Sequence, residues 1–151
     1  MTLKQEKVLK VAMSLLGTPY KYVVKWDKIP KKNPEYISCS SFIQFVFFNA
    51  FGMQLEWSTI LQAARAGRRV KGREALDIGD LIFFRGSKGH YDDDLFLNEK
   101  KRIYIGHVVL YIGRGQVIHA SGEDGAKKVL QESLMDIIKI RGPIVLVKRV
   151  I

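Results

Sequence analysis

The sequence contains very little cysteine: among its 151 residues, Cys39 carries the single thiol. One thiol cannot form an internal disulfide, and no histidine or second cysteine stands close to it in a metal-binding spacing. The fold therefore needs no oxidising compartment, and we expect no metal or other cofactor.

Long apolar runs are also lacking. No stretch reaches the roughly 18 consecutive apolar residues that a membrane-spanning helix needs, so no membrane span is expected. Residues 1–7 are polar and charged where a Sec-type signal peptide is apolar. We therefore expect no such export signal in the chain.

Acidic residues are outnumbered by basic ones. Lys and Arg number 25 against 15 Asp and Glu, and the resulting net charge of +10 favours an anionic partner. The basic residues cluster over 21–32 and 65–73. No nucleic-acid-binding motif accompanies them, and most aromatic residues lie inside apolar runs, where they could not stack on bases. No nucleic acid is expected, and a merely solvated surface is the plainer alternative to an anionic partner.

Helical signals fill the first part of the chain. Thr2 and Gln5 can form a capping box in front of a helix over 3–16. Its apolar stripe comprises Leu9, Ala12, Leu15 and Leu16. A second helix is expected over 40–51, apolar nearly all round and therefore buried, and a short third helix after Ser58.

Strand signals follow the helices. Strands are expected over 81–84, 105–112, 116–120 and 144–150, whereas the polar residues 85–102 are expected to form an irregular surface excursion. Helices followed by an antiparallel sheet define an α+β fold. Since 47% of the residues are hydrophobic and no linker or repeat is visible, we expect residues 1–151 to form a single domain.

Cys39 stands where the second helix begins, and His107 and His119 lie on the two strands of a hairpin. The N–H groups at a helix start lower a thiol pKa from about 8.5 and can also stabilise an oxyanion. One imidazole can act as general base while the other fixes its tautomer. These are the components of a cysteine nucleophile with its base and orienting group.

The register of the hairpin decides whether the two histidines meet. If Arg114 is the centre of a three-residue loop, paired residue numbers sum to 228, so Val109 faces His119. His107 then lies on the same face, diagonal to His119 and within about 7–8 Å. A two-residue loop would place the histidines on opposite faces, and we predict the three-residue register.

Taken alone, these residues leave the question open. A lone cysteine is commonly a small core hydrophobe, and a histidine in an apolar strand is commonly a hydrogen-bonded core residue. Two histidines at this spacing could also belong to a metal site whose third ligand comes from elsewhere.

The order of several segments is more specific than any one of them. These segments are residues 17–22 (GTPYKY), 38–47 (SCSSFIQFVF), 76–84 (LDIGDLIFF), 106–113 (GHVVLYIG) and 117–121 (VIHAS). Together they resemble the NlpC family of papain-like cell-wall cysteine peptidases over roughly residues 5–135. The resemblance implies a papain-like core in which the helix carrying the nucleophile packs on an antiparallel sheet. It also implies acyl-enzyme hydrolysis of amide bonds in peptidoglycan stem peptides, commonly between γ-D-glutamate and a diamino acid.

The resemblance also assigns roles to residues. Cys39 would be the nucleophile, His107 the general base and His119 the orienting third member. Tyr20 would line the cleft beside the thiol, and Ser40 would bind substrate next to the scissile bond.

Three features depart from the family pattern. Ser38 stands where the family usually has an acidic residue, which in relatives that need a free stem N-terminus is implicated in holding that amine. We keep Ser38 among the substrate-binding residues and expect an endopeptidase or an altered substrate. Val23-Val24 replaces the usual Gly-Gly, and the excursion over 85–102 is longer than the family pattern and is a candidate cleft wall.

The expected partners are peptidoglycan or a related γ-glutamyl peptide, together with anionic wall polymers bound through the basic surface. A papain-like acyltransferase or amidase acting on a lipid or polyamine conjugate is the alternative, and a non-catalytic wall-binding module is a third. We expect synthesis in a bacterial cytoplasm followed by delivery to the cell wall. A cytosolic enzyme acting on recycled wall peptides is the competing expectation.

Overall fold

A computed structural model describes residues 1–22, 24–86, 90–92, 102–122 and 127–151. The helices are α1 (Leu3–Ser14), α2 (Cys39–Phe51), α3 (Thr59–Arg65) and α4 (Leu134–Arg141). The strands are β1 (Arg68–Arg69), β2 (Leu81–Phe84), β3 (His90–Asp92), β4 (Arg102–Tyr104), β5 (His107–Gly113), β6 (Gln116–Ser121), β7 (Lys128–Ser133) and β8 (Ile144–Arg149).

The strands form two antiparallel sheets. The larger one has the order β1-β8-β2-β5-β6-β7, and β3 pairs with β4 separately. Among the described residues, three helices precede the larger sheet in the chain, the pair β3 and β4 lies between β2 and β5, and α4 lies between β7 and β8. The α+β architecture predicted from the sequence is confirmed, whereas β1, β7 and α4 were not predicted.

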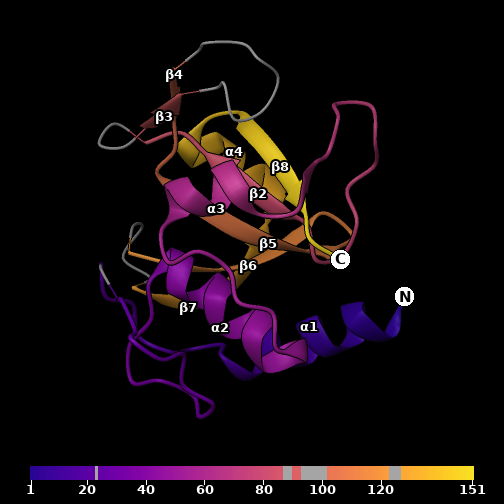
Figure 1. The fold of residues 1–151 in the computed structure, drawn as a ribbon. Coiled ribbons are helices and arrows are strands. Elements are labelled where there is room, and N and C mark those ends of the chain that lie inside the picture. The colour runs from indigo at the N-terminus through magenta and orange to yellow at the C-terminus, as the bar shows by residue number, and fades with distance from the viewer. Residues whose placement is uncertain (23, 87–89, 93–101, 123–126) are drawn as a thin grey trace.

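Helices cover both faces of the larger sheet, with α1 and α2 on one side and α4 on the other (Figure 1). Along β2, Phe83 belongs to the core on the α2 side and Phe84 to the core on the α4 side. All four residues of β2 are therefore buried, as expected for a strand that is covered on both faces.

Helix α1 begins as predicted, with reciprocal capping between Thr2 and Gln5. Val8 and Ala12 are its buried apolar residues, and Leu15, just beyond its end, is buried as well. The prediction that Leu16 joins this stripe is wrong, since Leu16 is 40% exposed. The helix ends at Ser14, so Leu16 lies in the following turn, where helical periodicity no longer sets its direction.

The predicted register of the hairpin between β5 and β6 is confirmed. Leu110 pairs with Ile118, so paired numbers sum to 228. The tip differs from the prediction, because Arg114-Gly115 forms a two-residue turn with both φ angles positive, as the hairpin turn types require. A bulge just before this turn restores the register. His107 and His119 therefore lie on the same face, the one that α4 covers.

The prediction that residues 85–102 are irregular is wrong in part, because β3 lies within this stretch and pairs with β4, which begins at its last residue. Tyr91 stands opposite Ile103 in this pair, and both residue types favour strands. Residues 87–89 and 93–101 of this stretch lie outside the described residues, so its predicted role as a cleft wall stays a prediction.

An ion pair connects the start of β2 to the end of β8. The Asp80 carboxylate is 1% exposed and accepts from Arg149 Nε at 2.8 Å and Nη2 at 2.7 Å. The same carboxylate also accepts from the Asp77 N–H at 2.8 Å. The buried acid thus holds the turn that leads into the central strands.

Candidate active site

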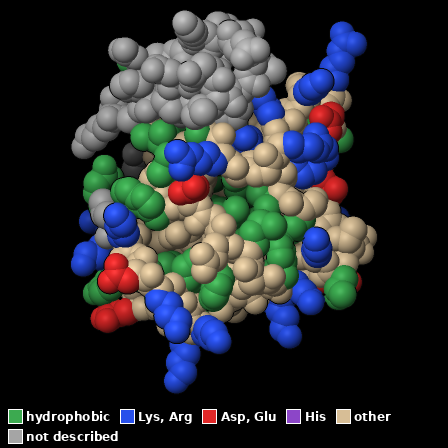
Figure 2. Space-filling model, viewed as in Figure 1, with side chains coloured by type: hydrophobic (Ala, Val, Ile, Leu, Met, Phe, Trp, Pro, Cys, Tyr) green, Lys and Arg blue, Asp and Glu red, His purple; other side chains and the backbone are tan. Residues whose placement is uncertain are grey.

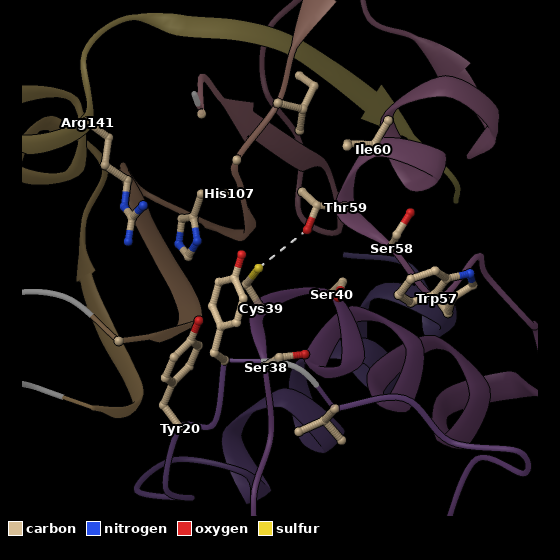
Figure 3. A pocket seen from close by; sticks show the side chains of 16 residues that line it. Tyr20, Ser38, Cys39, Ser40, Trp57, Ser58, Thr59, Ile60, His107 and Arg141 are labelled. Carbon is tan, nitrogen blue, oxygen red and sulfur yellow. Dashed lines mark hydrogen bonds between the residues drawn. The ribbon is translucent and has the colours of Figure 1, made fainter. Parts of the chain in front are cut away.

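A cleft of about 560 Å³ opens where the starts of α2 and α3 meet the start of β5. Cys39, Thr59, His107 and Arg141 all line it, although they come from four different elements. Figure 3 shows the Cys39 thiol between the Thr59 hydroxyl and the His107 ring, with Arg141 beside His107. The sheet and two helices thus bring a thiol, a base and a cation together at one opening.

Cys39 is the first residue of α2, one position earlier than the predicted helix start. Ser38 caps the helix: its Oγ accepts from the Ser41 N–H at 3.3 Å, and Ser41 Oγ accepts from the Ser38 N–H at 2.8 Å. Gln62 of α3 donates to the Ser40 carbonyl at 2.9 Å and to the Glu56 carbonyl at 2.8 Å. The helix start that carries the thiol is therefore stabilised by the Ser38 cap and by the hydrogen bond from Gln62.

The thiol of Cys39 is hydrogen-bonded to Thr59, with 3.4 Å between Sγ and Oγ1. Burial raises the pKa of Cys39 above its ordinary value, against smaller lowering effects of the Thr59 bond, backbone groups and the Arg141 charge. The prediction that the helix start lowers this pKa is therefore wrong in its net direction. Desolvation of the thiol outweighs the favourable N–H groups around it.

His107 is the first residue of β5 and is 3% exposed. Just before it, Gly106 meets Gly86 so closely that a Cβ built on either would lie 2.4 Å from the Cα of the other. Burial first, then the charges of Arg141 and His119, hold the pKa of His107 well below its usual value. At neutral pH the ring is therefore a neutral imidazole, the form that can accept a proton.

Behind His107 the polar contacts continue in a chain. His107 Nε2 lies 2.7 Å from His119 Nδ1, and the two rings are nearly perpendicular, at 77°. His119 Nε2 in turn lies 2.6 Å from Glu132 Oε2. Both nitrogens of the His119 ring, which is 1% exposed, are thus engaged by named partners.

The sequence-predicted residues Tyr20, Ser38 and Ser40 also line the cleft. The Tyr20 ring leaves no room for a side chain at position 122, because a Cβ there would lie 2.3 Å from the ring. Ser38 is 2% exposed, and its hydroxyl is occupied in capping α2. Val24 lines the cleft, whereas Val23 lies outside the described residues.

The residues at or near the site that were not singled out from the sequence include Trp57, Thr59, Glu132 and Arg141. Trp57 is 41% exposed at the cleft and lies under Lys25, whose Nζ is 4.3 Å from the ring centroid. Thr59 is the first residue of α3, the short helix that was predicted to follow Ser58. Glu132 and Arg141 belong to β7 and α4, the two elements missed between the hairpin and the last strand.

Two observations bear on other kinds of site. Among the described residues, no three His, Cys, Asp or Glu side chains are grouped so that they could hold a metal ion. Over the same residues, no helix is both long and apolar enough to cross a membrane.

The fold and the cleft are those of a papain-like α+β domain with a thiol at the start of its buried helix. The sequence model of the NlpC/P60 family matches residues 17–137, which is most of the chain. The chain therefore belongs to the NlpC/P60 family.

Two curated relatives show the extent of the sequence similarity. "Probable endopeptidase" of Haemophilus influenzae is 34% identical over 92 residues, covering 59% of this chain and 46% of the relative. "Murein DD-endopeptidase MepS/Murein LD-carboxypeptidase" of Escherichia coli K12 is 38% identical over 90 residues, covering 59% of this chain and 38% of the relative. The chain thus matches less than half the length of these relatives.

Solved structures share the fold. NlpC1 from Trichomonas vaginalis superposes with a TM-score of 0.70 at 20% identity, over 97% of this chain and 44% of that one. The similarity extends over nearly all of the chain.

Proposed function

We propose that this chain is a cysteine peptidase that hydrolyses amide bonds in peptidoglycan stem peptides, with residues 1–151 acting as one catalytic domain. The observation that carries the proposal is the meeting of Cys39 and His107 at one cleft, with His119 directly behind the base. Membership of the NlpC/P60 family supports the reaction class. The printed name of the E. coli relative, a murein endopeptidase, supports the substrate class.

In the proposed reaction His107 takes the thiol proton while Cys39 Sγ attacks the carbonyl carbon of the scissile amide. The oxyanion is bound by backbone N–H groups at the start of α2. Ser38 already accepts from the N–H groups of Ser41 and Phe42, so we assign the binding of the oxyanion to those of Cys39 and Ser40.

The remaining steps return the residues to their starting state. His107 gives its proton to the leaving amine, which departs and leaves a thioester on Cys39. A water molecule, deprotonated by His107, then attacks the thioester carbonyl, and the released thiolate takes the proton back. His119 keeps the His107 ring in position through both steps.

The resting site contains a thiol and a neutral imidazole, because burial raises the pKa of Cys39 and lowers that of His107. In this proposal the proton is transferred during attack and is not already separated in the free protein. The site therefore works by general-base catalysis.

Two bonds of the stem peptide are candidates. The family resemblance favours the bond between γ-D-glutamate and the diamino acid, whereas the name of the E. coli relative specifies DD-endopeptidase and LD-carboxypeptidase activities. Position 38 is a serine, so it offers no carboxylate to hold a free amine, and its hydroxyl is already bonded within the helix cap. This favours cleavage within a stem over removal of a residue next to a free N-terminus.

The surface charge supports an anionic polymer as a second partner. Basic side chains project around the face in Figure 2, and acidic ones are few there. The exposed members of the two basic runs are Lys21, Lys25, Lys28, Lys31, Lys32, Arg65, Arg68, Arg69, Lys71 and Arg73. We propose that the net charge of +10 holds the domain on anionic wall polymers while it cleaves.

Mass spectrometry of the products from a defined muropeptide mixture tests the proposed function. Stem peptides shortened at one bond identify both the peptidase and its bond. Intact stems together with a transferred acyl group on an added lipid or amine would instead identify an acyltransferase and overturn the proposal. No change in any muropeptide, with a protein shown to be folded, would support a binding module.

A further inference from the structure

We propose that Glu132 is a positioning residue that sets the tautomers of both His119 and His107, so that His107 presents an unprotonated nitrogen to Cys39. This inference rests on the proposed function for its kinetic consequence but not for its structural one. Glu132 stands at the outer end of the chain of contacts that begins at the cleft. Its carboxylate touches neither the thiol nor the cleft, so it acts through the two imidazoles.

The register of the sheet places Glu132 at this position. β7 pairs with β6 so that His119 faces Leu130 and Val117 faces Glu132. Glu132 is therefore a diagonal neighbour of His119 on the same face, and its Oε2 reaches His119 Nε2 at 2.6 Å. Its side chain is 23% exposed, so the carboxylate lies at the solvent-exposed end of this series of hydrogen bonds, whereas His119 is buried.

With His119 neutral, proton counting along the chain yields one arrangement. A carboxylate has no proton to donate, so the proton in the bond between His119 and Glu132 belongs to His119 Nε2. A neutral imidazole carries one N–H, which leaves His119 Nδ1 as an acceptor. The bond of 2.7 Å to His107 then requires the proton on His107 Nε2. His107 Nδ1 is left with a free lone pair.

The opposite arrangement would disable the base. Were His119 protonated on Nδ1, that N–H would be the donor to His107 Nε2, and the His107 proton would lie on Nδ1. A His107 ring protonated at Nδ1, the nitrogen that is not bonded to His119, has no lone pair left to take the thiol proton. Without an obligatory acceptor at Nε2, His119 is free to adopt either form, so Glu132 selects the competent one.

The negative charge has a second effect during the reaction. When His107 accepts the thiol proton it becomes an imidazolium facing Cys39, with the cations Arg141 and, when protonated, His119 also acting on it. Arg141 opposes that charge. A carboxylate hydrogen-bonded to His119 favours it through the polarised chain, as a buried acid does behind the base of a serine protease.

Glu132→Gln is the variant of choice, because it keeps the size and shape of the side chain. Its amide can accept from His119 with the oxygen or donate with the nitrogen, so it no longer selects a tautomer. Asp136→Asn is the matched control, since it removes the same charge from an exposed residue of the adjoining helix α4. On a soluble stem peptide, kcat of Glu132→Gln should fall about 10- to 100-fold with KM within about twofold.

A direct readout needs no substrate. Long-range ¹H–¹⁵N spectra distinguish the protonated from the unprotonated nitrogen of each imidazole, and the wild-type protein at neutral pH should show His107 and His119 both protonated on Nε2. Glu132→Gln should show a mixture of tautomers, whereas Asp136→Asn should match the wild type in spectra and in kcat.

Two results would overturn the proposal: wild-type His107 protonated on Nδ1, or Glu132→Gln with the wild-type tautomers and kcat. If Glu132 had only a structural role, Glu132→Gln would lower the melting temperature and leave the ring tautomers unchanged. The ¹H–¹⁵N spectra distinguish this result from a change of tautomer. If no peptide is cleaved but the Nε2 tautomers are found and shift in Glu132→Gln, the tautomer assignment stands and the proposed function fails.

Discussion

The hydroxyl of Thr59 lies 3.4 Å from the thiol of Cys39, although the two residues belong to different helices. This bond lowers the pKa of Cys39 and partly offsets the raising effect of burial. Thr59 is the second residue after Glu56-Trp57, a segment that Gln62 ties to the start of α2 through the Glu56 and Ser40 carbonyls. The thiol and its hydroxyl partner are thus held in one local network.

Thr59→Val should make the thiol less reactive. The substitution keeps the branched shape but removes the hydroxyl, so the thiolate loses a hydrogen bond worth about 0.5–1.5 kcal/mol. The rate of alkylation by iodoacetamide at neutral pH should fall about two- to tenfold. Thr59→Ser, which keeps the hydroxyl, should alkylate like the wild type. Equal rates for the valine variant at every pH would show that the bond does not tune the thiol.

Arg141→Gln tests the cation of the cleft. The positive charge of Arg141 lowers the pKa of both Cys39 and His107, so its removal should raise both values. Alkylation against pH reports the thiol, and the ring-proton NMR signal reports His107. Lys139→Gln, an exposed basic residue of the same helix, is the matched control and should leave both titrations unchanged. If the two variants gave the same curves, Arg141 would not act on the pair.

His107 should make the stability of the fold depend on pH. Its pKa is well below the ordinary value in the folded protein but lies near 6.5 in an unfolded chain. The unfolded chain therefore binds more protons below about pH 6.5, and stability falls as the pH falls from there toward the folded pKa, by up to about 1.4 kcal/mol per pH unit. Urea denaturation at about pH 7.5 and about pH 5 measures this loss.

His107→Gln should be less sensitive to pH over the same window, since glutamine does not titrate. Its absolute stability can differ from that of the wild type, because only the difference between the two pH values is compared. An identical loss in wild type and variant would contradict a neutral, buried His107.

Salt should release the protein from isolated cell walls. If the net charge of +10 holds it on anionic polymers, retention should weaken steeply above about 0.15 M salt, where the Debye length is near 8 Å. Retention that is unchanged in about 1 M salt would show that shape or hydrogen bonding holds the protein on the wall. The basic side chains would then be solvated without contributing to binding.

The helices and the hairpin could be predicted because their signals are local. The cap at Thr2, the glycine after α2 and the apolar runs of β5 and β6 on either side of a short Gly-containing turn are all readable within a few residues. β7 was missed because, as the edge strand of the larger sheet, it mixes polar and apolar residues. The helix α4 had a readable signal, with Leu134, Ile137 and Ile138 at helical spacing.

Cys39, His107 and His119 could be named from the sequence because motif and register both pointed to them. The direction of the thiol pKa could not be predicted, since it depends on how far the folded chain shields Sγ from water. Glu132 and Arg141 depend on pairing between β6 and β7 and on where α4 ends. Such contacts depend on the tertiary packing of elements that lie far apart in the sequence, and local sequence patterns do not reveal them.

Cys39→Ala tests the central claim most directly, because it removes only the sulfur while the capped helix start remains. With purified peptidoglycan, the wild-type protein should release new amino groups, and the variant should release none above the background while its thermal unfolding stays cooperative. A folded Cys39→Ala variant that releases amino groups at the wild-type rate would contradict the assignment of this thiol as the nucleophile.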